Sequence, residues 1–114
     1  MNLFMKRGEF WEVAFERDVV HLRDAKGLQY IATLLRRPRT AIHAAELRSG
    51  GATEAADDGA RVERDRLMVT QRIKAALRKI RQSSPALGEH LEKAIRTGRY
   101  CRYDPQEPVP WDVS

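Results

Sequence analysis

Residues 61–82, RVERDRLMVTQRIKAALRKIRQ, contain no proline or glycine and carry the clearest helical repeat in the chain. On a helical wheel the apolar side chains gather within an arc of about 100°, the width of a stripe that faces a protein core. This stripe consists of Val62, Val69, Ile73, Ala76, Leu77 and Ile80. The opposite side holds Arg64, Gln71, Lys74, Arg78 and Arg81. The pattern predicts a long amphipathic helix whose apolar side organises the fold.

The polar side of this helix has a one-sided charge pattern. From Arg66 to Gln82 the segment contains six basic residues and no acidic one. A helix that only faces solvent usually mixes signs, because like charges one turn apart repel and opposite charges attract. We therefore interpret the basic side as a surface for a negatively charged partner. The alternative is a solvated face that contacts nothing.

Length and composition limit the class of protein. A chain of 114 residues has the size of one domain, so residues 1–114 are treated as a single domain. The hydrophobic share of 42% and the charged share of 32% suit a folded protein with a modest core. The formal net charge of +5 favours an anionic partner, whether nucleic acid, an acidic membrane surface or an acidic protein.

The compartment follows from cysteine usage and from the absence of long apolar runs. Cys101 is the only cysteine, which excludes an internal disulfide framework and agrees with a reducing environment. No apolar run approaches the roughly 18 residues that a membrane-spanning helix needs. Charges at Lys6 and Arg7 interrupt the segment where a signal peptide would have its apolar core. We expect a cytoplasmic, soluble protein.

The N-terminal part of the chain alternates as strands do. Residues 10–15 and 19–23 are expected to pair as an antiparallel hairpin, with Trp11 in the core; stacking on a ligand is the alternative for Trp11. Asp24 is placed as the N-cap of a helix over residues 25–37, which Pro38 ends. A brief strand over residues 40–42 follows.

The remaining elements surround the long helix. His43 is expected to open a short helix over residues 44–47, and the glycine-rich residues 49–60 read as a flexible loop. Pro85 begins a helix over residues 85–95. A turn at 97–98, a strand over residues 99–103 and an extended tail over residues 104–114, held by Trp111, complete the chain.

No pattern in the sequence supports catalysis or a metal site. The histidines His21, His43 and His90 and the thiol of Cys101 lack the paired spacing of metal ligands. There is no nucleophile motif and no phosphate-binding glycine loop. We expect neither an enzyme nor a cofactor.

The order of the expected elements is that of a winged helix-turn-helix, an α+β fold with an N-terminal hairpin, three to four helices and a C-terminal wing. In that design the last helix of the motif lies in the DNA major groove. Glutamine pairs with adenine there, and arginine or lysine with guanine. The groove-facing set would be Arg64, Gln71, Lys74 and Arg78, with Thr70 and Arg81 at its edges. The turn between Arg96 and Arg99 would be the wing, placing two guanidinium groups beside a phosphate or in the minor groove.

Several segments carry a resemblance to a known family. VVHLRDAKGLQYIATLLRRPRTAIHAAEL, RDRLMVTQRIKAALRKI and IRTGRYCRYDP resemble the winged-helix effector domain of bacterial response regulators. More closely, HLRDAKGLQYIATLLRRP and SPALGEHLEKAIRTGRYCRYDP, together 40 residues, are similar to a domain at the ends of large bacterial regulators and signalling ATPases. The chain departs from the response-regulator pattern in its longer loop over residues 49–60, in the extra helix over residues 85–95, and in the single wing glycine Gly98.

Two functions follow as expectations. The first is a transcriptional regulator that binds double-stranded DNA, with a homodimer expected because paired half-sites raise affinity. The second is a protein-interaction or dimerisation module with the same fold. Leu67, Met68 and the apolar residues 1–5 lie outside the expected core and would serve that role. Charge reversal of Lys74 and Arg78 separates the two functions.

Overall fold

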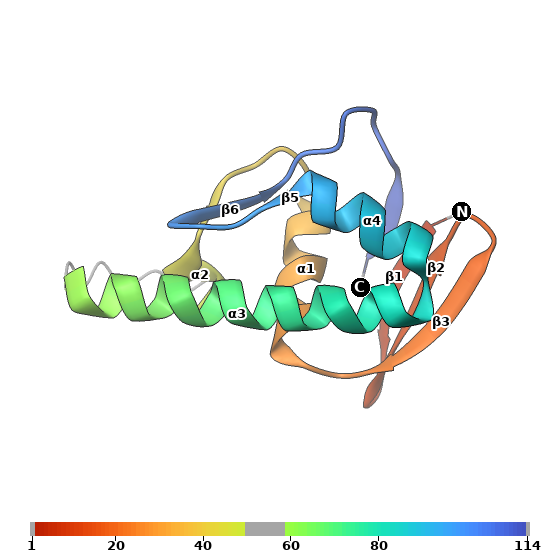
Figure 1. The fold of residues 1–114 in the computed structure, drawn as a ribbon, viewed down its shortest axis with the longest axis horizontal. Helices are drawn as coiled ribbons and strands as arrows, with labels where there is room; N and C mark the ends of the chain where they lie inside the picture. The colour runs from red at the N-terminus through yellow and green to blue at the C-terminus, as the bar shows by residue number, and fades with distance from the viewer. Residues whose placement is uncertain (1, 50–58, 114) are drawn as a thin grey trace.

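The computed structural model describes residues 2–49 and 59–113, in which two sheets and four helices form an α+β fold, as expected (Figure 1). Residues 50–58, most of the expected loop, lie outside the described residues, as does the side chain of Val62. The elements in chain order are β1 (Asn2–Arg7), β2 (Phe10–Phe15), β3 (Asp18–Arg23), α1 (Lys26–Arg36), β4 (Ile42–His43), α2 (Ala44–Ser49), α3 (Gly59–Ser83), α4 (Pro85–Ala94), β5 (Ile95–Arg96), β6 (Tyr100–Tyr103) and β7 (Trp111–Val113).

The N-terminal sheet has the strand order β3-β2-β1-β7. The predicted β2–β3 hairpin is confirmed, and Trp11 is buried in the core. The prediction of an exposed apolar patch at residues 1–5 is wrong, because residues 2–7 form β1 and pair with β2. Alternation explains the difference: Phe4 points into the core and is fully buried, while its neighbours Leu3 and Met5 lie on the partly exposed face.

Helix α1 begins at Lys26, one residue later than predicted, so its N-cap position falls on Ala25 instead of Asp24. Ala25 occupies the N-cap position without a side-chain hydrogen bond. The Asp24 carboxylate instead accepts the indole N–H of Trp11 at 2.7 Å, because Trp11 needs a partner for its only polar group once it is buried. The N-cap prediction for Asp24 is therefore wrong. The prediction for α2 is better, since the Nδ1 atom of His43 accepts the backbone N–H of Ala45 at 3.1 Å and so caps this helix.

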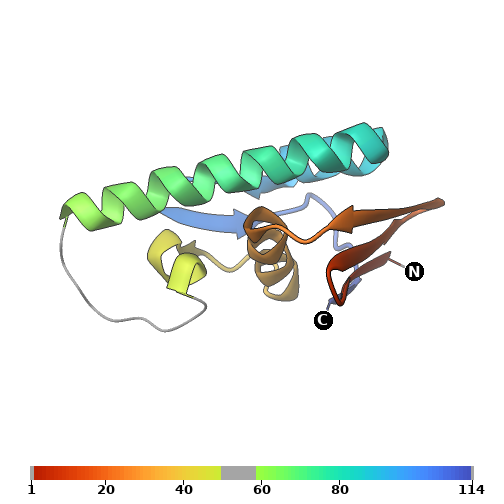
Figure 2. The same ribbon diagram turned by 90° about the horizontal axis from the view of Figure 1, so that it is seen from below.

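The long helix α3 runs along one side of the molecule, with α4 folded back beside it (Figure 1). Seen from below, α3 and α4 form one layer, and α1, α2 and the N-terminal sheet lie beneath them (Figure 2). The described part of the predicted apolar stripe is confirmed, and its members are all buried: Val69, Ile73, Ala76, Leu77 and Ile80. Two glycines allow close helix packing. A Cβ atom at Gly27 would lie 2.1 Å from the carbonyl oxygen of Arg72, and one at Gly88 would lie 2.6 Å from the Cα atom of Arg81.

The C-terminal segment contributes strands to both sheets. Strands β5 and β6 form a hairpin, and β6 also pairs with β4. The tail was expected to be extended and held by Trp111; its residues 111–113 form β7, which pairs parallel to β1. Trp111 stacks on Phe15 with a centroid distance of 5.8 Å, and its indole N–H donates to the hydroxyl of Tyr103 at 3.2 Å.

Candidate nucleic-acid interface

One side of α3 is left uncovered by the other described residues. Helices α1 and α2 pack against one flank of α3, and α4 packs against the other. The exposed side chains between these flanks recur at intervals of three and four residues, so they form a single row along the helix. The row consists of Arg64, Leu67, Gln71, Lys74 and Arg78. Sequence reasoning placed four of these five residues on the exposed polar side of the helix and assigned Leu67 to contact with a protein partner.

The cations of this row have no acidic partner in the described part of the chain. Arg64, Lys74 and Arg78 make no ion pair there, although the same helix carries acidic residues. Those acids are engaged elsewhere. Glu63 pairs with Arg66 one turn away, and the buried carboxylate of Asp65 accepts from Arg48 of α2 at 2.5 Å. The row therefore presents uncompensated positive charge to the solvent.

Two residues predicted for the edge of the site are less available to a partner than the row, one because its hydroxyl is buried and one because it is paired. The hydroxyl oxygen of Thr70 is buried on the flank of α3 and has no hydrogen-bond partner, so Thr70 does not belong to the exposed row. Arg81 is exposed but lies 2.7 Å from the carboxylate of Glu92 on α4, which neutralises much of its charge. The Arg81 outcome depends on α4, whose packing on this flank no helical wheel of α3 alone represents.

The β5–β6 hairpin lies beside the N-terminal half of α3. Arg96 and Arg99 at its turn are exposed, as predicted. The hydrogen bond from Arg66 lowers the pKa of Glu63, and the nearby charge of Arg99 lowers it further. The hairpin tip is therefore close to the first described turns of α3. The backbone carbonyl of Arg99 also accepts the N–H of Ala44, at 2.9 Å, which ties the tip to the start of α2.

A groove of about 300 Å³ connects the helix row to the hairpin. Lys74 and Arg78 line it on the α3 side, and Thr97 lines it on the hairpin side. Glu92 lies in the same groove, and Arg81 neutralises it. The row and the hairpin thus form one continuous surface rather than two separate basic regions.

The two tyrosines of β6 have different roles. Tyr100 is 56% exposed and meets His43 edge to face, with a centroid distance of 5.1 Å. Tyr103 is fully buried, and its hydroxyl lies 2.6 Å from the Nε2 atom of His90. Only Tyr100 is available to a ligand. The alternation of β6 explains the split, since side chains two residues apart would share a face and those three apart do not.

One exposed cation was missed. Lys79 lies on α3 next to the row and has no acidic partner among the described residues. Its position between the two predicted faces of the wheel kept it out of the expected site. The run Arg78-Lys79 was the available signal, because two adjacent basic residues near a helix C-terminus seldom both point inward.

The described residues contain neither a cluster of metal ligands nor a membrane-spanning helix. Within them, no group of three or more His, Cys, Asp and Glu side chains is arranged to hold a metal ion. None of the helices in the described ranges combines the length and apolar character needed to cross a membrane.

Comparisons with protein-family models, with curated proteins and with solved structures find no match to this chain.

Proposed function

We propose that the protein binds double-stranded DNA as a winged-helix transcriptional regulator, with α3 in the major groove and the β5–β6 hairpin as the wing. The observation that carries this proposal is the row of unpaired cations on α3, continuous with the exposed Arg96 and Arg99 of the hairpin. Such an arrangement attracts the phosphate backbone and presents donors to base edges at the same time.

The connectivity supports the winged-helix assignment. Helix α1 is followed by β4, α2 and α3, and the β5–β6 hairpin returns so that β6 pairs with β4. This pairing holds a wing beside the helix that would enter the groove. Helix α4 is an addition to that plan, and it lies beside the exposed row, on the flank that contains Leu77 and Arg81, with Glu92 in the same groove as Lys74 and Arg78.

The chemistry of the row suits base reading. The exposed row from Arg64 to Arg78 is about four helical turns long, and the major groove is wide enough to admit such a helix. Gln71 offers an amide for adenine, and Lys74 and Arg78 offer donors for guanine. Arg96 and Arg99 would contact phosphates or the minor groove, which fixes the register of the helix.

The test is a fluorescence-anisotropy titration of mixed-sequence duplex DNA at several salt concentrations. On mixed-sequence DNA all five cations of the surface (Arg64, Lys74, Arg78, Arg96 and Arg99) would lie near phosphates, so the logarithm of the binding constant should fall by roughly four to five per tenfold increase in salt. The double variant K74E/R78E should weaken binding at least about tenfold. The matched control R17E/R23E reverses two exposed charges on the N-terminal sheet and should retain more of the affinity. Absence of binding at low salt, or equal losses in both variants, would refute the proposal.

A second function is favoured by one observation. Leu67 is 46% exposed in the middle of the row, where an apolar side chain suits a protein partner or a second copy of the chain. Sedimentation of the variant Leu67→Asp separates the two functions. A parent dimer that dissociates in this variant, together with no binding to DNA, supports the interaction module.

A further inference from the structure

A second groove lies away from the exposed row of α3, between α1, α2 and the β1–β2 turn. Its volume is about 830 Å³, within the range of small-ligand sites. Five of its thirteen lining residues are Lys or Arg, and one, Glu46, is acidic. Glu46 is paired with Arg37 at 3.3 Å, so the groove as a whole is positive.

Four polar residues of α1 form the floor of this groove. Lys26, Gln29, Thr33 and Arg36 recur at intervals of three and four residues and all line it. Lys26 and Arg36 stand at the two ends, about 15 Å apart along the helix axis. Neither has a carboxylate partner among the described residues. The guanidinium of Arg36 donates to the hydroxyl of Thr33 at 3.3 Å, which holds it along the helix.

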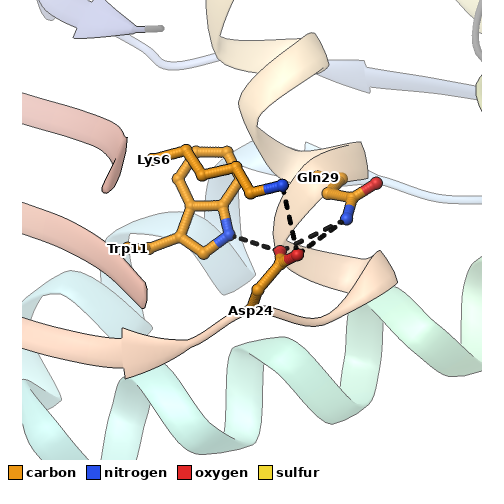
Figure 3. A network of polar contacts seen from close by, with 4 residues as sticks. All are labelled: Lys6, Trp11, Asp24 and Gln29. Carbon is orange, nitrogen blue, oxygen red and sulfur yellow. Dashed lines mark hydrogen bonds and ion pairs between the residues drawn. The ribbon is translucent and has the colours of Figure 1, made fainter. Parts of the chain in front are cut away.

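The amide of Gln29 is oriented by a network behind it (Figure 3). Its nitrogen donates to both carboxylate oxygens of Asp24, at 3.2 and 3.1 Å. A carboxylate only accepts, so the nitrogen must face Asp24 and the amide oxygen must point away from it, as Figure 3 shows. Trp11 and Lys6 bind the same carboxylate, at 2.7 and 3.3 Å, and keep it in place.

These donors also set the ionisation of Asp24. Burial by itself raises the pKa of Asp24, but the hydrogen bonds from Trp11, Gln29 and Lys6 outweigh it. The pKa therefore lies below its ordinary value of 3.8, and Asp24 stays charged at neutral pH. Gln29, which lines the groove between Lys26 and Arg36, therefore keeps its amide oxygen directed away from Asp24, where it can accept a hydrogen bond.

We propose that this groove binds a small phosphate ester that also carries an N–H donor, the chemistry of a nucleotide. Lys26 or Arg36 would hold the phosphate by charge-assisted hydrogen bonds, and the amide oxygen of Gln29 would accept an N–H of the base. The volume of the groove, about 830 Å³, admits a nucleoside monophosphate. The inference is independent of DNA binding by α3, because no residue of the exposed row lines this groove.

The experiment is calorimetric titration of the full chain with the 5′-monophosphates of adenosine, guanosine, cytidine and uridine, at millimolar concentration and physiological ionic strength. At least one nucleotide should bind, and its nucleoside should bind about tenfold more weakly or not at all. The variants K26A/R36A and Gln29→Ala should each weaken that nucleotide about tenfold or more. The control Lys79→Ala removes an exposed cation outside the groove and should leave the affinity unchanged.

Four results would overturn the proposal: no nucleotide binds, nucleoside and nucleotide bind equally, K26A/R36A has no effect, or Lys79→Ala weakens binding as much. Duplex DNA is titrated into K26A/R36A as a second arm. A loss of DNA affinity as large as the loss of nucleotide affinity would assign the groove to the DNA surface and would also overturn the proposal. If K74E/R78E does not affect DNA binding, that result counts against the proposed role of α3 in binding DNA and leaves the nucleotide proposal unaffected.

Discussion

Replacement of Gly27 by alanine tests whether α1 and α3 are packed as closely as the structure indicates. The added Cβ atom would lie 2.1 Å from the carbonyl oxygen of Arg72, 2.8 Å from its carbonyl carbon and 2.9 Å from the Cβ atom of Ala76. Ordinary van der Waals contacts of a Cβ atom begin near 3.4 Å. Two of the three neighbours are backbone atoms of a helix, so the clash cannot be relieved by rotating a side chain. Helix α3 would have to move away from α1 by more than about 1 Å.

The cost of this movement has two opposing parts. Overpacking in a close-packed core costs about 1–3 kcal/mol. Alanine is the better helix former by up to about 1 kcal/mol, which offsets part of that cost. The net free energy of unfolding should therefore fall by about 1–2 kcal/mol. The same movement would stretch the hydrogen bond from Arg72 to the hydroxyl of Tyr30, which measures 2.9 Å.

Urea unfolding followed by circular dichroism measures the effect. Gly27→Ala should lower the midpoint without changing the slope, since the surface exposed on unfolding is nearly the same. Lys26→Ala, the neighbouring exposed position in the same helix turn, is the control and should stay within about 0.5 kcal/mol of the parent. A Gly27→Ala protein as stable as the parent, or more stable, would show that the two helices are not in backbone contact.

Three further predictions concern single side chains. Because the pKa of Asp24 is lowered in the folded state, its contribution to stability is complete above its ordinary value of 3.8 and is lost as the pH falls through the lower folded value. In acid unfolding, the free energy of unfolding of the Asp24→Asn variant should therefore fall less steeply over that pH range than that of the parent protein. Glu92→Gln should release Arg81 and raise DNA affinity severalfold at low salt, and an unchanged affinity would remove Arg81 from the DNA surface. Tyr103→Phe should lower the free energy of unfolding by about 1–3 kcal/mol, because the partly buried indole N–H of Trp111 loses its acceptor and His90 loses its contact with the Tyr103 hydroxyl; thermal unfolding measures this loss.

Periodicity within the sequence was sufficient for elements that each carry a complete pattern. The apolar stripe of α3 defined both its core side and the exposed row, since a helix fixes the angle between residues. The alternation of residues 10–15 and 19–23 defined the β2–β3 hairpin for the same reason. His43 was recognisable as a cap because its position directly before a short helical pattern determines its role.

The errors came from partners that lie far away in the sequence. Residues 2–7 are too short to show whether their alternation belongs to a strand or to a disordered end, and pairing with β2 and β7 decides it. Asp24 lies where a cap belongs, yet the indole of Trp11 competes for its carboxylate. Both cases depend on hydrogen bonds between segments that are distant in the sequence, and a local sequence pattern carries no information about such bonds.

For the candidate site, the sequence by itself determined which α3 residues share a polar side and that their charge is of one sign. Only the tertiary structure decided which of them stay available. The folded structure buries the hydroxyl of Thr70, helix α4 brings Glu92 to Arg81, and the pairing of β6 with β4 holds the hairpin that carries Arg99. The physical reason is that a helical wheel fixes angles within one element, whereas burial and charge compensation depend on what packs against it.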